Sequence, residues 1–255
     1  MALVFRDITN KKSIKHFTYT FKEGFVHAVV GNKALELVDI LNGSDKMFSG
    51  DVLVDEMPIN NRMISYIKLD DYLYTRRVKD DLRIMNEYLK IDRKTISDRV
   101  DKYFELFGLN FSFYSRLNNT LSKTERCIVN IIKGLVTDAK IIVFDDLFSS
   151  LDYKYSKVLK KIISNLRSSD KVVIVKDDIN VLQMIANDII IVGEKGMIVS
   201  GNINDICIDV ELLNGINIMA PYLSNITYKA RKEKGINIGF HKDIRDIIKD
   251  IYKHV

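Results

Sequence analysis

The chain has 255 residues, of which 47% are hydrophobic, enough for a large buried core and too many for bulk disorder. The formal net charge is +5, with a mildly basic C-terminal tail that we expect to be a solvated helix face, so no nucleic-acid partner is expected. No apolar stretch is long enough to cross a membrane, and the first residues lack the pattern of a secretory signal. The two cysteines, Cys127 and Cys207, fit no disulfide or zinc framework, which favours a reduced cytosolic setting.

The N-terminal part has the pattern of half-exposed antiparallel strands. Residues 1–12 predict a strand with a charge inside it. Phe17, Tyr19 and Phe21 alternate with polar residues, and residues 50–55 (GDVLVD) form a similar short run. We therefore expect an antiparallel β subdomain at this end of the chain.

Three short apolar runs predict strands that are covered on both faces: residues 25–30, 140–144 and 171–175. Each run is followed by a segment that can be helical. This alternation predicts an α/β fold with a mainly parallel central sheet.

The middle and the end of the chain are predicted to be helical. Apolar residues between 96 and 107 recur on one helix face, and Gly108 can end that helix. Ser122 and Glu125 have the spacing of a capping box at the start of another helix. Two further helices are expected around residues 221–234 and 243–253. We predict a main domain over residues 1–212, with a helical insert at about 76–136, and a small C-terminal appendage over residues 213–255.

The residues with the clearest chemical pattern lie between 121 and 179. A helix start with the pattern LS..E comes first, then a buried strand that ends in Asp145 and Asp146, and then SSLD at residues 149–152. A carboxylate at the carboxyl end of a sheet strand can hold Mg²⁺ bound to nucleotide phosphates. Each element alone also fits a plain helix or loop cap, but the order of the three favours a common ancestry with a nucleotide-binding cassette.

This order of motifs resembles the nucleotide-binding subunits of ABC transporters, and it is most similar to the A subunit of energy-coupling factor (ECF) transporters. Residues 121–125 (LSKTE) stand where the family has the LSGGE signature, residues 149–152 resemble its D-loop, and residues 172–179 resemble the strand that enters its histidine switch. Residues 228–244 are similar in layout to the family's C-terminal part. The resemblance implies a P-loop NTPase-like ABC cassette in which Ser122, Glu125 and Asp152 lie at a dimer interface, and in which Asp145 holds Mg²⁺ if nucleotide binds.

The segment that corresponds to the family's phosphate-binding loop departs from the pattern GxxGxGKS/T. Residues 31–43 are three residues short, and three residues carry about 10 Å of chain at most. Ala34 stands at the lysine position and Leu35 at the Ser/Thr position. A nucleotide-binding remnant is left in Gly31, Asn32 and Lys33, where Lys33 is either a displaced phosphate ligand or, as we favour, a surface lysine.

Other positions that carry chemistry in the family are also changed. Lys68 replaces the Q-loop glutamine and Asp177 replaces the switch histidine. Lys123 and Thr124 replace the two glycines of the signature. Asp146 replaces the catalytic glutamate, and its shorter side chain makes it a weak candidate base.

The helix after Gly31 is predicted to be stable without a phosphate at its start. Asn32 is a suitable N-cap residue. Glu36 places a carboxylate in or near the first turn, where it can complement the helix dipole and repel a phosphate, or else point to solvent.

We therefore expect a degenerate subunit, a pseudo-ATPase, of an ECF-like transporter. It would pair as a heterodimer with an active ABC ATPase subunit, and an integral membrane subunit would dock on its helical insert. No cofactor is certain, and Mg-ATP is expected to bind only if the nucleotide site is functional. Two alternatives stay open: a weakly active ATPase that drives vitamin or metal-ion uptake, and a soluble ABC-like protein that binds RNA or ribosomes. The expected location is the cytoplasmic face of the cell membrane.

Overall fold

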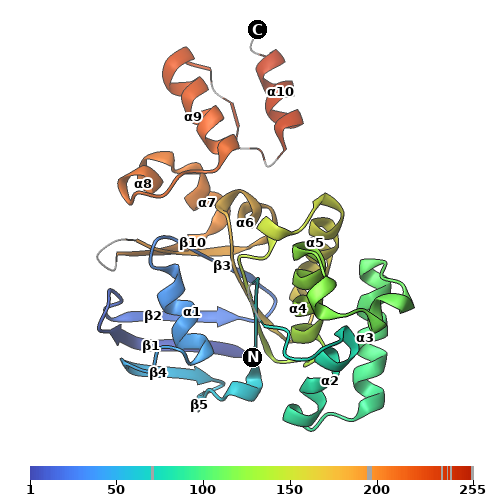
Figure 1. Cartoon of the computed structure of the whole chain (residues 1–255). Coiled ribbons are helices and arrows are strands. Elements are labelled where there is room, and N and C mark those ends of the chain that lie inside the picture. The colour runs from blue at the N-terminus through green and yellow to red at the C-terminus, as the bar shows by residue number, and fades with distance from the viewer. Residues whose placement is uncertain (70–71, 194–196, 237, 240, 242, 254–255) are drawn as a thin grey trace.

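The computed structural model describes residues 1–69, 72–193, 197–236, 238–239, 241 and 243–253 (Figure 1). The strands form an antiparallel sheet of order β2-β1-β4-β5 and a mainly parallel sheet of order β10-β9-β3-β8-β7-β6. They are β1 (Ala2–Asn10), β2 (Phe17–Lys22), β3 (Val26–Val30), β4 (Phe48–Val54), β5 (Met57–Pro58), β6 (Ile64–Lys68), β7 (Ile141–Asp145), β8 (Val172–Lys176), β9 (Asp188–Val192) and β10 (Ile198–Asn202). The predicted α/β class and the antiparallel N-terminal sheet are confirmed.

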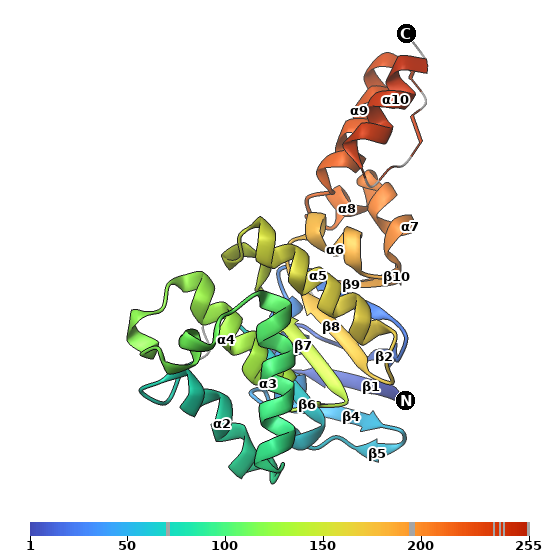
Figure 2. The same ribbon diagram turned by 90° about the vertical axis from the view of Figure 1, so that its right-hand side faces the viewer.

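The helices fall into three groups by their position (Figures 1 and 2). Helix α1 lies between the two sheets, helices α2 to α6 pack on the other face of the large sheet, and α7 to α10 follow β10 and extend away from the sheets. They are α1 (Ala34–Asn42), α2 (Val78–Leu89), α3 (Arg93–Phe107), α4 (Lys123–Leu135), α5 (Tyr153–Arg167), α6 (Ile179–Ile185), α7 (Ile203–Ile208), α8 (Val210–Gly215), α9 (Tyr222–Lys234) and α10 (Ile244–Lys253). Short 3-10 turns lie at Asn61–Met63, Phe111–Ser115, Asn118–Thr120 and Phe148–Ser150.

The three apolar runs form β3, β7 and β8, which are neighbours in the parallel sheet. In β8, Val172 and Ile174 face the core shared with α1, while Val173 and Val175 face the core under the helical insert. Both faces of the strand are therefore buried, which is why its sequence is apolar without alternation.

The strand register determines which residues meet at the carboxyl edge of the large sheet. In β8, Lys176 lies opposite Val29 of β3 on one side and opposite Asp145 of β7 on the other. Lys68 ends β6 opposite Asp145. The loop after β3 and the ends of β6, β7 and β8 therefore meet at one edge, where ligands collect in open α/β folds.

The predicted helices of the middle segment are present. Asp92 caps α3 by accepting a hydrogen bond from the Thr95 backbone N–H (2.9 Å), and Gly108 ends this helix in the left-handed conformation, with φ 64°. Helix α4 packs against β6. The limits of the helical insert, 76–136, remain a prediction.

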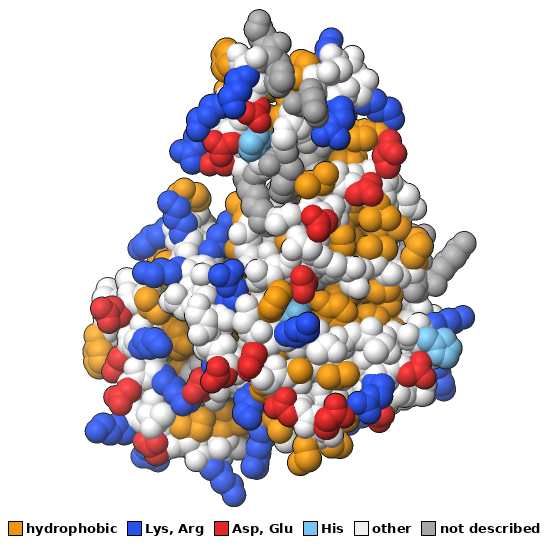
Figure 3. Space-filling view, turned by 180° about the vertical axis from the view of Figure 1, so that it is seen from behind, with side chains coloured by type: hydrophobic (Ala, Val, Ile, Leu, Met, Phe, Trp, Pro, Cys, Tyr) orange, Lys and Arg blue, Asp and Glu red, His pale blue; other side chains and the backbone are white. Residues whose placement is uncertain are grey.

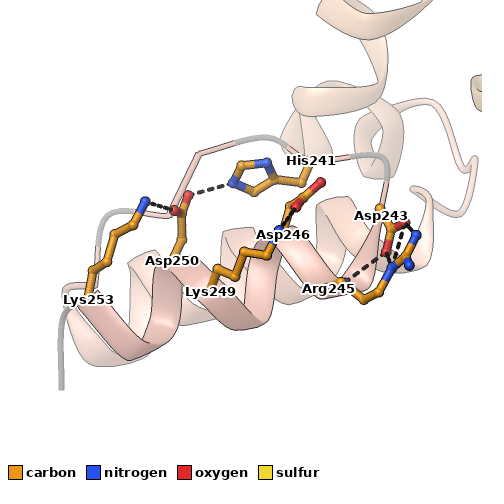
Figure 4. Close-up of polar contacts among 7 residues, drawn as sticks. All are labelled: His241, Asp243, Arg245, Asp246, Lys249, Asp250 and Lys253. Carbon is orange, nitrogen blue, oxygen red and sulfur yellow. Dashed lines mark hydrogen bonds and ion pairs between the residues drawn. The ribbon is translucent and has the colours of Figure 1, made fainter.

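The C-terminal helices α9 and α10 project from the end of the fold (Figure 1). Helix α10 carries ion pairs along its exposed side, and Asp250 also binds His241 in the preceding segment (Figure 4). The segment over residues 228–244 includes positions 237, 240 and 242, which lie outside the described residues. The predicted division after residue 212 falls within α8 (Val210–Gly215), and the two-part organisation stays a prediction.

Acidic and basic side chains are interspersed over the face shown in Figure 3, and hydrophobic side chains lie between them. Among the helices in the described ranges, none is long and apolar enough to cross a lipid bilayer.

Gly31, between β3 and α1, is required by both its conformation and its surroundings. Its φ is 114°, and a Cβ placed there would lie 2.3 Å from the carbonyl oxygen of Val192. We predict that Gly31→Ala lowers the free energy of unfolding by more than about 2 kcal/mol, since backbone on both sides must shift. The measurement is urea unfolding followed by circular dichroism.

Gly24→Ala is the matched control for this prediction. Gly24 also has a positive φ, 78°, but a Cβ there would meet no atom within 4 Å among the described residues. Gly24→Ala should lower the free energy of unfolding by about 1 kcal/mol, which is the cost of the left-handed conformation alone. Equal losses in the two variants would contradict a role for the contact with Val192.

Candidate functional site

The connection between β3 and α1 is short. Only residues 31–33 separate the two elements. The prediction that Asn32 caps the helix is wrong, because Lys33 is the N-cap residue and its side chain does not cap. Ala34, at the family's lysine position, is buried, and Leu35 is exposed.

Three backbone N–H groups at the start of α1 have acceptors within the chain. Lys33 donates to the carbonyl oxygen of Val192 (3.2 Å), Ala34 to that of Gly31 (3.0 Å), and Glu36 to that of Lys33 (3.0 Å). The first N–H groups of a helix commonly bind an anion because they lack such partners. Here these three donors are used by the protein itself.

A carboxylate occupies the first turn of α1. Glu36 is only 6% exposed, and its Oε2 atom accepts hydrogen bonds from Asn10 Nδ2 (2.9 Å) and Ser13 Oγ (2.8 Å). The Lys33 ammonium lies 3.6 Å from its Oε1 atom. The sequence left open whether Glu36 points inward or to solvent, and the structure shows that it points inward.

The pKa of Glu36 reflects two opposing effects. Burial raises it, but the hydrogen bonds from Asn10 and Ser13 and the charge of Lys33 outweigh burial, so the pKa lies below its ordinary value. The carboxylate is therefore held ionised at the positive end of the helix dipole, where a negative charge is favourable.

Residues 10–13 form the turn that brings these donors to Glu36. Asn10 ends β1, and its Oδ1 atom accepts hydrogen bonds from the backbone N–H groups of Lys12 (3.1 Å), Ser13 (2.9 Å) and Ile14 (2.9 Å). The side chain of Asn10 thus shapes the turn with its oxygen and binds Glu36 with its nitrogen.

Both oxygens of Asp145 are bound by neighbouring side chains. The Lys176 ammonium lies 2.8 Å from Oδ1, and the Tyr66 hydroxyl donates to Oδ2. Burial raises the pKa of Tyr66, and the hydrogen bond and charge of Asp145 raise it further, which keeps the hydroxyl a donor. Tyr66 comes from β6 and Lys176 from β8, on either side of Asp145 in β7.

Lys176 also binds Asp146, whose Oδ2 atom lies 2.5 Å from the ammonium. Asp146 has a φ of 53°, and its backbone N–H donates to the Lys176 carbonyl (2.8 Å). Burial opposes the charge of Lys176, but its bonds to Asp145 and Asp146 more than offset burial, and its pKa is raised. An oxygen of the candidate base is therefore held by a cation of the same chain.

Asp177 and Lys68 lie at the same edge and have different surroundings. Asp177 accepts hydrogen bonds from the backbone N–H groups of Phe148 (3.0 Å) and Asp178 (2.9 Å), so it fixes the turn that follows β7. Burial raises the pKa of Asp177 despite these bonds. Lys68 is exposed at the end of β6.

The signature and D-loop positions form a connected set of helix caps. Ser122 and Glu125 make the predicted capping box: the Glu125 N–H donates to Ser122 Oγ (3.2 Å) and the Ser122 N–H to Glu125 Oε2 (2.8 Å). Thr124 donates to the carbonyl oxygen of Ser150 (2.8 Å), and Asp152 caps α5 through the Tyr155 N–H (3.0 Å). The placement of these residues at a dimer interface stays a prediction.

These residues do not fit bound Mg-ATP. The loop after β3 is short, and three N–H donors at the start of α1 are bonded to backbone carbonyls. The Glu36 carboxylate lies where the helix start would face a phosphate. The carboxylate expected to bind the metal is already bound by an ammonium and a hydroxyl. The hollow at this edge has a volume of about 350 Å³, and its lining includes Asp146, Asp177 and Asp178.

Comparison with known proteins agrees with the order of motifs. No family model matches the chain. It is 22% identical over 256 residues to "Energy-coupling factor transporter ATP-binding protein EcfA2" of Clostridium acetobutylicum, covering 92% of this chain and 87% of that protein. The chain resembles the ATP-binding subunits of ECF transporters.

Solved structures show the same fold. The cbiO1 protein of Clostridium perfringens, described as part of the ABC transporter complex cbiONQ, superposes with a TM-score of 0.69 at 20% identity, covering 89% of this chain and 98% of that one. A second ATP-binding subunit of an ABC transporter gives a TM-score of 0.74 at 13% identity, covering 91% and 100%. The ABC-cassette fold expected from the sequence is confirmed.

Sequence reasoning missed two residues of this site, Tyr66 and Lys176. The motif analysis gave neither of them a role. A lysine directly after the buried run of residues 171–175 is an available signal, because its neighbour strand ends in Asp145 and Asp146. Recognising that pairing requires the strand order, which the sequence alone does not provide.

Glu36→Gln should lower the free energy of unfolding by about 1–2 kcal/mol at pH 7, because it removes a buried charge that is hydrogen-bonded and lies at the positive end of a helix. Since the folded pKa lies below the ordinary 4.5, the charge stabilises the fold at neutral pH, and this contribution is lost as the pH falls through the folded pKa. The difference between wild type and variant should therefore narrow below pH 4.5. Urea unfolding at pH 7 and at successively lower pH values measures it.

Glu56→Gln provides the control, since Glu56 is an exposed partner of Arg6 and its loss should change stability by less than about 0.5 kcal/mol. A difference for Glu36→Gln that does not depend on pH would contradict the role assigned to the charge.

Proposed function

We propose that this chain is a non-hydrolysing subunit of an ECF-like ABC transporter. It forms the structural half of a heterodimer with an active ABC ATPase subunit, and it binds an integral membrane subunit on the cytoplasmic face of the membrane. The curated relatives carry the name of ECF ATP-binding proteins, and their similarity extends over most of the chain.

The observation that carries the proposal is the buried carboxylate of Glu36. Its bonds to Asn10 and Ser13 tie the first turn of α1 to the turn after β1. A phosphate at this helix start would meet a negative charge in place of free donors. The same interaction stabilises the nucleotide-free fold and disfavours nucleotide, so a subunit with this site acts through its shape and its contacts with partners.

The signature and D-loop segments, which would face an ATPase partner, depart less from the family pattern than the loop after β3 does. In ABC dimers each ATP site combines the phosphate-binding loop and metal-binding carboxylate of one subunit with the signature segment of the other. Ser122 and Asp152 are at exposed helix starts, and the Thr124–Ser150 hydrogen bond links the two segments. These features support a role in completing the partner's site.

A groove beside the helical insert supports docking of a membrane subunit. It has a volume of about 670 Å³ and combines apolar and basic side chains. Its lining residues are Leu69, Tyr72, Leu73, Thr75, Asn118, Asn119, Lys123 and Arg126. A buried carboxylate, Asp81, fixes one wall by accepting hydrogen bonds from Thr75 and Asn118. We therefore propose this groove as the contact surface for the membrane subunit.

The alternatives from the sequence have less support. A weakly active ATPase that drives vitamin or metal-ion uptake needs Asp145 for the metal and Asp146 as the base, and Lys176 holds both carboxylates. Binding to RNA or ribosomes needs a basic surface, and on the face in Figure 3 the basic side chains are interspersed with acidic ones.

Calorimetric titration of the purified chain with Mg-ATP should give a dissociation constant of millimolar or weaker, because the loop is short and its donors are used. Glu36→Thr should stay in the same range, since removing the carboxylate does not lengthen the loop. A micromolar constant for the wild type would contradict the proposed function. Micromolar binding by Glu36→Thr alone would show that loop length is not the obstacle.

Asp152→Ala should weaken complex formation or lower the ATPase rate of the partner in the reconstituted transporter, if Asp152 lies at the interface. The variant also loses a helix cap, worth about 1 kcal/mol. Asp92→Ala is the matched control, because Asp92 caps α3 in the same manner. Equal assembly and equal ATPase rates for the two variants would contradict the interface role of Asp152.

A further inference from the structure

We propose that Lys176 is a built-in counter-cation that takes the place of a bound metal ion at the carboxyl edge of the large sheet. The inference deepens the proposed function and rests on it in one respect, namely that the chain works without Mg-ATP. The inference names the group that offsets the negative charge of Asp145 and Asp146. Its test needs neither nucleotide nor a partner subunit.

The Lys176 ammonium is shared between two carboxylates. It bridges two carboxylates on consecutive residues, 2.8 Å from Asp145 Oδ1 and 2.5 Å from Asp146 Oδ2. The Tyr66 hydroxyl binds the second oxygen of Asp145, so both of its oxygens have donors. Asp145 is buried, and burying a carboxylate is costly unless an opposite charge or hydrogen-bond donors lie beside it.

The position of the ammonium distinguishes it from an ordinary surface ion pair. Lys176 belongs to β8, which lies between β3, the strand before the shortened loop, and β7, the strand that ends in Asp145. Its side chain is 17% exposed and lines the hollow at this edge together with Gly31 and Ala34. Among the eight described residues that line this hollow, three are acidic and Lys176 is the one basic residue.

A tethered cation differs from a metal ion in one important respect, because it cannot dissociate. One of the two negative charges at the end of β7 is therefore balanced at every metal concentration, and the Asp146 N–H to Lys176 carbonyl bond adds a backbone link between the same strands. Without the lysine, two carboxylates would remain close together. Such a pair of hard oxygen ligands suits a divalent cation such as Mg²⁺.

The test is thermal unfolding of the full chain with Lys176→Met, in MgCl₂ and in NaCl of equal ionic strength. Loss of one partner of a buried ion pair should lower Tm by roughly 5 °C or more. Magnesium should then raise the Tm of the variant by about 3 °C at a concentration tenfold above its dissociation constant. The wild type should show no magnesium-specific shift.

Lys171→Met is the matched control. Lys171 precedes β8 at its other end, is 16% exposed, and pairs with Asp138 at 2.8 Å and with two backbone carbonyls. This variant should lose stability without gaining a response to magnesium. The double variant Lys176→Met with Asp145→Asn removes the buried charge as well as its partner, so it should fold even if Lys176→Met alone does not, and should not respond to magnesium.

Two results would overturn the inference. One is a magnesium response in Lys176→Met no larger than that of Lys171→Met, and the other is a double variant no more stable than Lys176→Met. Either result, combined with continued absence of ATP binding in calorimetry, would leave the proposed function standing. Tight ATP binding by the wild type would instead contradict the proposed function itself.

Discussion

A buried charge has to be neutralised close by, and at the edge of this cassette the chain supplies the opposite charges and donors itself. Glu36 is held by Asn10, Ser13 and Lys33, and Asp145 by Lys176 and Tyr66. In a nucleotide-binding cassette the corresponding places are expected to face phosphate and metal. Here a negative side chain stands at the helix start and a positive one beside the strand end. The Glu36 carboxylate thus stands in the place expected for a phosphate, and the Lys176 ammonium in the place expected for a metal ion.

The parallel register of the large sheet makes this arrangement work. Because β8 lies between β3 and β7, a single long side chain at its end reaches the two carboxylates at the end of β7, Asp145 and Asp146. The short loop after β3 brings α1 close to β9, where the Lys33 N–H finds the Val192 carbonyl. Loop length, strand order and charge placement are therefore consistent with one another. Such agreement is expected where a site is stable without a ligand.

Sequence reasoning predicted the fold well because its evidence is local. Apolar runs of five or six residues gave β3, β7 and β8, a one-sided apolar pattern gave α3, and the spacing of Ser122 and Glu125 gave the capping box. The site was harder. Whether Glu36 points inward depends on Asn10, which is 26 residues away, and the partner of Asp145 is 31 residues away in β8. Asn32 was wrongly expected to cap α1: the N-cap residue is Lys33, one position later, and its N–H donates to the Val192 carbonyl.

The central claim is that the start of α1 is complete without a ligand. Amide hydrogen exchange of residues 31–42 in the wild-type chain, with and without millimolar Mg-ATP, tests it most directly. The bonds of the Lys33, Ala34 and Glu36 N–H groups predict slow exchange without nucleotide and no change when Mg-ATP is added. Fast exchange in this segment that becomes slow only with Mg-ATP would contradict the account.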